Sequence, residues 1–298
     1  MKTTRRQLLA GAAALAAGSL APATPAQEAP AAAAPPRFRL SLAAYSFRDL
    51  LPRGEKKGVM TLHDLLDKCA EWRLDAFEPT SYYFSSEETA YLHSLKAKAF
   101  RLGLAISGTA VGNNFCLPPG EDRDRQMADM KRWIGNAVEI GAPIIRVFAG
   151  SKNARADRDT AYGWAVEGLR EACDYAGTRG VFLAIENHGY LTESADDVLR
   201  LLRAVDNEWF TVNLDTGNFD DDPYGNMAKL APESLNVQVK AAVKVNGKKE
   251  TADYPRIAEI LRAANYRGYV ALEYEEDADP MTAVPDHLAK LRAALDAV

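Results

Sequence analysis

Short apolar runs alternate with longer amphipathic stretches over most of this chain. The run at residues 181–185 is continuously apolar, which is typical of a strand buried on both faces of a parallel sheet. The amphipathic stretches place apolar residues at helical spacing, as Leu62, Leu65 and Cys69 do. The pattern predicts eight strands, at residues 39–47, 75–79, 104–108, 143–149, 181–189, 210–215, 235–240 and 269–273. It predicts helices at residues 61–72, 86–102, 123–140, 156–178, 194–204, 254–264 and 280–297.

The regular order of strand and helix favours a single (β/α)8 TIM barrel of the α/β class. Strict alternation gives parallel strands, since each helix must carry the chain back across the sheet, and eight such units close into a barrel. The connection at residues 217–234 is the least regular, because Pro223 and Pro232 leave room for only a short helix. An open doubly wound sheet is the alternative. That fold usually carries a glycine-rich phosphate turn after its first strand, where this chain has F-R-D-L at residues 47–50.

The first 37 residues differ in composition from the rest and are not expected to belong to the barrel. A twin-arginine start, T-R-R-Q-L-L at residues 4–9, is followed by an alanine-rich apolar run and a small-residue cleavage site at residues 24–26. We predict a twin-arginine signal peptide at residues 1–26, an Ala/Pro-rich linker at 27–37 and the barrel at 38–298. Such export delivers a folded protein to the periplasm or the cell exterior. The apolar run is too short for a stable membrane span.

Charge and cysteine content narrow the function classes. The net charge of −5 argues against a nucleic-acid surface. The pair Lys248-Lys249 is expected to be ordinary solvated loop. The cysteines, Cys69, Cys116 and Cys173, are scattered and odd in number, so we interpret them as small buried residues and not as a disulfide framework or a zinc site.

Polar side chains stand at or near the ends of the last four predicted strands. They are Glu186, Asp215, Gln238 and Glu273, and all four are oxygen donors. Because the C-terminal ends of barrel strands surround one mouth, these side chains are expected to meet there. Three carboxylates in a small cavity need protons or a cation to neutralise them. Oxygen-only ligation favours one hard divalent ion, Mn²⁺ or Mg²⁺, with Zn²⁺ and Co²⁺ as less favoured alternatives.

Other residues are expected to face the same mouth. His188 lies two residues beyond Glu186 and is a candidate hydrogen-bond donor to substrate. Arg146 would be costly to bury unpaired, so it should pair with a carboxylate or reach the ligand. The further candidate substrate-binding residues are Asn218, Lys240, Glu78 and Tyr45, with Phe47 and Phe148 as possible wall residues that are more simply explained as barrel core.

Four short motifs resemble those of the xylose isomerase-like TIM-barrel family of sugar (phosphate) isomerases and epimerases. They are A-I-E-N-H at residues 184–188, L-D-T-G-N at 214–218, Q-V-K at 238–240 and L-E-Y at 272–274. The resemblance implies that Glu186, Asp215, Gln238 and Glu273 hold one divalent metal, that Glu186 and Glu273 are the catalytic proton carriers, and that the partner is a small carbohydrate. Two positions depart from the common pattern. Gln238 stands where many members have His, although the hydroxypyruvate isomerase-like branch resembles this chain in using Gln. Asn218 stands where many members have His.

The leading hypothesis is therefore metal-dependent proton transfer next to the carbonyl of a sugar or keto-sugar, through an ene-diolate. The same site could support elimination by a keto-sugar lyase or hydratase. A second class is a metal-dependent endonuclease, which would need more histidine ligands and a basic groove. A third class is a non-catalytic sugar-binding barrel.

Overall fold

The computed structural model describes residues 38–152 and 156–298. The predicted signal peptide and linker, residues 1–37, lie outside the described residues. The chain divides into two units, Met1–Pro35 and Pro36–Val298, and the second is described by itself.

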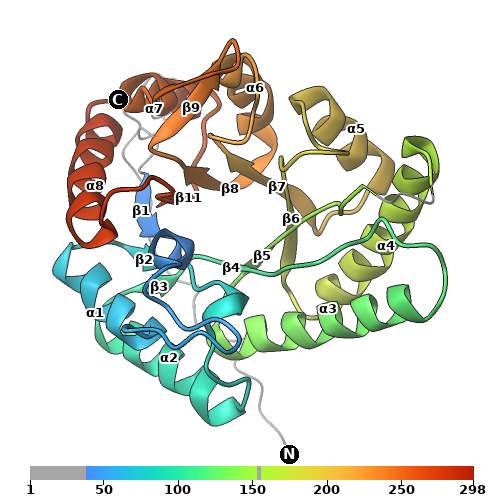
Figure 1. Ribbon diagram of the computed structural model, residues 1–298, viewed down its shortest axis with the longest axis horizontal. Helices are drawn as coiled ribbons and strands as arrows, with labels where there is room; N and C mark the ends of the chain where they lie inside the picture. Colours follow the sequence, from blue (N-terminus) through green and yellow to red (C-terminus); the bar gives the residue numbers. More distant parts are fainter. Residues whose placement is uncertain (1–37, 153–155) are drawn as a thin grey trace, which may run out of the picture. The chain divides into compact units, whose positions relative to one another are not determined.

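Parallel strands form the centre of this unit, and helices surround them (Figure 1). The strands are β1 (Arg39–Leu42), β2 (Ala76–Phe77), β3 (Ala105–Ile106), β4 (Thr109–Ala110), β5 (Ile144–Val147), β6 (Phe182–Glu186), β7 (Phe210–Asp215), β8 (Ser234–Val239), β9 (Ala242–Val245), β10 (Lys248–Thr251) and β11 (Tyr269–Leu272). The helices are α1 (Leu62–Glu71), α2 (Thr89–Arg101), α3 (Glu121–Ile140), α4 (Arg158–Thr178), α5 (Ala195–Val205), α6 (Pro223–Leu230), α7 (Tyr254–Ala263) and α8 (Pro280–Asp296), with short 3₁₀ turns η1 (Ala44–Phe47), η2 (Ser81–Tyr83) and η3 (Ala231–Glu233).

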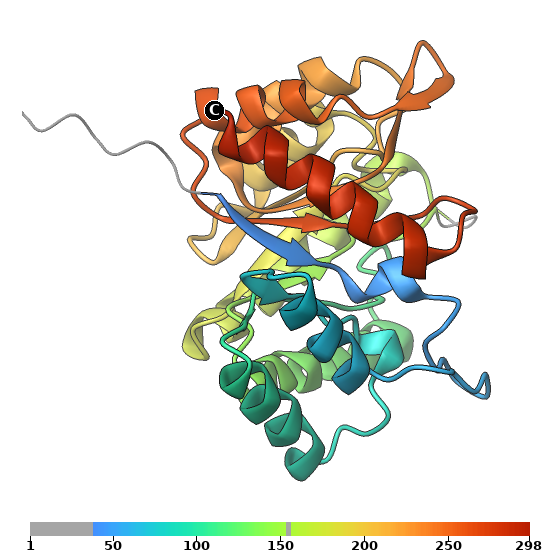
Figure 2. The same ribbon diagram turned by 90° about the vertical axis from the view of Figure 1, so that its left-hand side faces the viewer.

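The parallel sheet closes on itself as a TIM-barrel-like fold. Seven strands pair in the order β1-β11-β8-β7-β6-β5-β4, and β2 pairs with β3. Parallel bridges from Ala43 to Glu78 and from Thr80 to Ala110 join the β2–β3 pair to its neighbours on both sides. The segments β3 and β4 are two parts of one barrel position, so eight positions surround the axis, as the alternating pattern predicts. Figure 2 looks onto α8, which lies outside β1 and β11.

Local sequence signals explain several helix ends. Thr61 caps α1, where its hydroxyl accepts a hydrogen bond from the amide of Asp64 while the Asp64 carboxylate accepts one from the amide of Thr61. Gly141 ends α3 in the left-handed conformation, with a φ of 79°. Cys69, Cys116 and Cys173 are buried, as predicted. Within the two described ranges, no helix has the length and apolar content needed to cross a membrane.

Two local predictions were wrong. The first strand ends at Leu42, and the residues Ala44–Phe47 form a 3₁₀ turn instead of continuing it. The hydroxyl of Ser46 holds this turn, since it donates to the carbonyl of Leu272 and accepts from the amide of Tyr274. Lys248 and Lys249 lie in the exposed strand β10 of an antiparallel hairpin, and not in a loop. Its turn is Asn246-Gly247, and both residues have positive φ angles, as a two-residue hairpin turn of type I′ requires.

Candidate functional site

The polar residues predicted at strand ends are brought to one end of the barrel. Glu186 and Asp215 are the last residues of β6 and β7, Gln238 is the last but one of β8, and Glu273 directly follows β11. Asp215 is the pairing partner of Gln238 across β7 and β8. All four side chains are buried. Parallel pairing of neighbouring strands therefore gathers three carboxylates and an amide from positions far apart in the chain.

A cavity of about 170 Å³ opens at this end of the barrel. Its lining residues are Tyr45, Arg53, Tyr82, Arg146, Phe148, Glu186, His188, Asn218, Lys240, Glu273 and Glu275. The predicted residues Asp215, Gln238 and Glu78 are buried and do not line it. The other seven predicted site residues line the cavity, and so does Phe148.

Glu186 is held from two sides. Arg146 Nε lies 2.9 Å from Glu186 Oε2, and both side chains are buried. The amide of Asn218 donates to Glu186 Oε1 at 2.8 Å. Arg146 also donates to the carbonyl of Val111 at 3.0 Å, and its guanidinium lies 4.1 Å from the centre of the Phe148 ring. Arg146 is therefore paired with a carboxylate, which is one of the two outcomes expected for a buried arginine.

His188 completes the wall beside Phe148. The two ring centres are 4.7 Å apart and the rings are tilted by 49°. The amide of His188 donates to the Thr192 hydroxyl at 3.0 Å, which fixes the backbone just beyond β6. The imidazole is thus placed at the cavity by a short turn and by ring packing.

Lys240 lies among three carboxylates. Its Nζ atom is 3.3 Å from Asp215 Oδ2, 3.4 Å from Glu273 Oε2 and 2.7 Å from Glu275 Oε2. Burial alone would lower the pKa of Lys240, but the negative charges of Asp215, Glu273 and Glu275 outweigh burial and hold the pKa well above its usual value. Lys240 is therefore an ammonium ion in a nearly enclosed acidic setting.

The carboxylates of Asp215 and Glu273, next to Lys240, are themselves buried. Desolvation by burial raises the pKa of Glu273 and of Asp215, and the neighbouring carboxylates add to this effect while Lys240 opposes it. Asp215 Oδ1 accepts from the amide of Gly217, and the Asn187 side chain bonds both the amide and the carbonyl of Asp215. Asp215 Oδ2 is buried and has no hydrogen-bond partner in the described part of the chain.

A network of amides around Glu78 lies within the barrel. Gln238 Nε2 donates to Glu78 Oε1 at 2.6 Å, and Asn236 Nδ2 donates to Glu78 Oε2 at 2.7 Å. Asn213 Nδ2 in turn donates to Gln238 Oε1 at 2.6 Å. Burial raises the pKa of Glu78 to about 7 in spite of these hydrogen bonds. In this arrangement both ends of the Gln238 amide are engaged inside the barrel.

The chemistry of the donor set fits a hard divalent cation, since the site offers carboxylate oxygens, among them Asp215 Oδ2, which accepts no hydrogen bond in the described part of the chain. Lys240 stands between Asp215 and Glu273, and among the described residues no three His, Cys, Asp or Glu side chains are placed to hold a metal together. The predicted cofactor thus stays a prediction.

The sequence analysis did not identify three of the residues that line the candidate cavity. Glu275 lies two positions beyond Glu273, and the same two-residue spacing that pointed to His188 could have found it. Tyr82 lies in η2, just after the β2 strand end, and Arg53 lies in the loop after η1. The Arg53 guanidinium lies 4.6 Å from the centre of the Tyr82 ring. These loop positions carry no strand or helix periodicity, so the pattern gave no signal for them.

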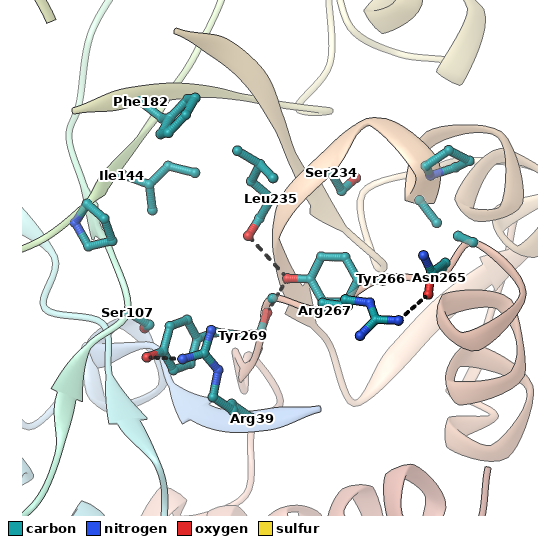
Figure 3. Close-up of a pocket in the computed structure, with 15 residues that line it drawn as sticks. Arg39, Ser107, Ile144, Phe182, Ser234, Leu235, Asn265, Tyr266, Arg267 and Tyr269 are labelled. Carbon is teal, nitrogen blue, oxygen red and sulfur yellow. Dashed lines mark hydrogen bonds between the residues drawn. The ribbon is translucent and has the colours of Figure 1, made fainter. Parts of the chain in front are cut away.

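A second cavity, of about 460 Å³, lies at the opposite, N-terminal ends of the strands (Figure 3). Arg39 donates to the Tyr269 hydroxyl at its edge, and Arg267 donates to the Asn265 side chain. Its walls are largely apolar, with Ile144, Phe182 and Leu235 facing it. It contains none of the clustered carboxylates, and TIM-barrel active sites lie at the C-terminal face. The smaller cavity is therefore the candidate active site.

The fold and this constellation of strand-end residues define a class of protein. The chain belongs to the xylose isomerase-like TIM barrel family, whose model matches residues 66–294. The comparison with curated proteins gave no match.

Solved structures support the fold at low sequence identity. A D-psicose 3-epimerase, solved in the presence of D-fructose, is 18% identical with a TM-score of 0.72, covering 87% of this chain and 99% of that one. A 3-keto-D-glucoside 4-epimerase from E. coli is 18% identical with a TM-score of 0.69, covering 86% and 99%. A xylose isomerase-like TIM barrel protein from Mycobacterium smegmatis, solved in complex with magnesium, is 18% identical with a TM-score of 0.65, covering 87% and 98%.

Proposed function

We propose that this chain is a sugar isomerase or epimerase that moves a proton on a carbon next to a carbonyl, with Glu186 and Glu273 as the proton carriers. The observation that carries the proposal is that both glutamates line one small cavity together with two buried cations, Arg146 and Lys240. The family adds support, and so do the solved epimerase structures that share the fold.

Proton transfer needs a group that can both take and return a proton near neutral pH. Burial raises the pKa of Glu273 above that of an ordinary glutamate, which brings it closer to the range where acid and base forms are both available. Glu186 is the second carrier, and its place between Arg146 and Asn218 fixes its orientation.

The negative charge that develops on the carbonyl oxygen needs stabilisation. Arg146 and Lys240 supply fixed positive charge beside the glutamates, in a setting where little solvent rearrangement is required. The aromatic rings of Phe148, Tyr45 and Tyr82 line the same cavity and exclude water. His188 and Asn218 are suited to binding the hydroxyl groups of a sugar.

The predicted cofactor is one divalent ion, Mn²⁺ or Mg²⁺. Glu186, Asp215, Glu273 and Gln238 would hold it, and it would polarise the carbonyl and acidify the neighbouring C–H bond. The magnesium complex of the M. smegmatis relative supports this part of the proposal.

The cavity volume bears on the class of substrate. About 170 Å³ is well below the roughly 300–1,000 Å³ usual for pockets that hold drug-sized ligands, so the substrate is a small sugar or hydroxy-ketone. Return of the proton to the other face gives epimerisation, and return to the other carbon gives isomerisation. Loss of a neighbouring hydroxyl would give the lyase or hydratase outcome from the same glutamates.

The test is solvent exchange. The purified protein is incubated in deuterated water with a panel of keto-sugars, and NMR follows deuterium incorporation next to the carbonyl, before and after chelation. The proposal expects exchange on at least one sugar, lost on chelation and restored by Mn²⁺ or Mg²⁺. Sugar binding without any exchange would favour the non-catalytic sugar-binding barrel instead.

A further inference from the structure

Lys240 occupies the place where a cation is expected. Its Nζ atom is within 3.4 Å of Asp215 and of Glu273, two of the four predicted metal ligands. Its side chain is only 8% exposed. These contacts neutralise part of the negative charge of the two carboxylates.

The position of Lys240 is set by its backbone and its stem. Its amide donates to the Thr216 hydroxyl at 2.9 Å, which ties the end of β8 to the turn after β7. The stem lies against Gly217, where a Cβ atom would come within 2.5 Å of Lys240 Cγ. The hydrogen bond of the amide and the close packing of the stem therefore determine where the ammonium of Lys240 lies.

An ammonium and a divalent ion cannot share the same oxygens at close range, because like charges repel strongly in a site with little water. We propose that Lys240 is a built-in counter-cation of the metal site, and that a divalent ion binds only when Lys240 Nζ leaves Asp215 and Glu273. The inference rests on the proposed function, since it takes these two carboxylates as metal ligands.

Glu275 gives the displaced ammonium a partner. It is the nearest of the three carboxylates, at 2.7 Å, its side chain is 38% exposed, and it is not a predicted metal ligand. Lys240 can therefore give up its two inner partners and keep this ion pair. The divalent ion would then neutralise Asp215 and Glu273 in place of Lys240, and the cost of moving Lys240 weakens metal binding.

The experiment measures Mn²⁺ binding without substrate, by electron paramagnetic resonance of free Mn²⁺. Lys240→Met removes the ammonium, and its matched control is Lys249→Met, which breaks the 2.7 Å ion pair of an exposed lysine with Glu276. We expect Lys240→Met to bind Mn²⁺ at least tenfold more tightly than the wild type, and Lys249→Met to match the wild type.

A second readout covers the case in which Lys240→Met does not fold. A crystal of the wild-type protein is soaked in Mn²⁺ and the ion is located by its anomalous scattering. The inference expects Lys240 Nζ to have left Asp215 and Glu273. It is overturned if Mn²⁺ binds while Lys240 stays in place, if Lys240→Met binds no more tightly than the wild type, or if neither protein binds Mn²⁺. None of these outcomes decides whether the glutamates exchange substrate protons, which is measured separately.

Discussion

Glu78 is a carboxylate enclosed by amides, and no ion pair neutralises it within the described residues. The amides of Gln238 and Asn236 fix its position, yet desolvation still raises its pKa. Its strand-end position suggested a substrate contact from sequence. The structure places it inside the barrel instead, where it orients Gln238. A strand pattern predicts which residues point inward, but not how deep each side chain lies.

The buried Glu78 makes stability depend on pH. The pKa of Glu78 is about 7 in the folded protein, against an ordinary value of 4.5. The contribution of its protonated form to the free energy of unfolding is therefore fully present below pH 4.5 and is lost as the pH rises through 7. Glu78→Gln should remove this loss, which amounts to at most about 3 kcal/mol. Urea unfolding at pH 5 and pH 8 tests it, with Glu55→Gln, an exposed glutamate, as control. An equal drop in unfolding free energy between the two pH values in wild type and Glu78→Gln would contradict this account.

At the scale of elements, strand ends and the turns after them build the site. The sequence pattern located β7, β8 and β11 to within one residue at either end, because buried parallel strands read as apolar runs. It placed the end of β6 three residues too late, since the strand ends at Glu186 and not at Gly189. It missed the hairpin of β9 and β10, although Asn246-Gly247 is a strong hairpin signal. It also missed the contacts of Lys240, since these depend on side chains from two strands and a loop meeting in space.

Gly217 shows how tightly the turn after β7 packs on the site. A Cβ atom there would lie 2.5 Å from Lys240 Cγ and 3.0 Å from the Ala242 carbonyl. Gly217→Ala should therefore destabilise the protein by about 1–3 kcal/mol and displace Lys240. Gly163→Ala is the control: it lies in α4 with nothing within 4 Å, so it should stabilise by about 0.5–1 kcal/mol. Chemical denaturation measures both. An unchanged midpoint for Gly217→Ala would refute the packing argument.

At the scale of the whole molecule, the barrel is what makes distant residues meet. The alternation of strands and helices predicted it, and the family match and the solved structures confirm the TIM-barrel fold. The substrate could not be predicted in the same way. The candidate cavity is lined in part by loop residues such as Arg53 and Tyr82, whose places follow from the closed ring and not from any periodic pattern.

Export is a proposal that concerns the intact chain. The twin arginines Arg5 and Arg6 should direct the folded protein out of the cytoplasm. Replacing both by lysine should leave the protein in the cytoplasm with its fold unchanged, and cell fractionation measures this. A fully exported double variant would argue against the twin-arginine route.

The most direct test of the central claim compares solvent exchange in single-residue variants. On the keto-sugar that the wild type exchanges, Glu186→Gln and Glu273→Gln should each slow deuterium incorporation by about 10²–10⁴-fold while sugar binding stays within a few-fold. Glu276→Gln, a nearby residue that does not line the cavity, should exchange at the wild-type rate. Wild-type exchange rates in both Glu186→Gln and Glu273→Gln would contradict the account.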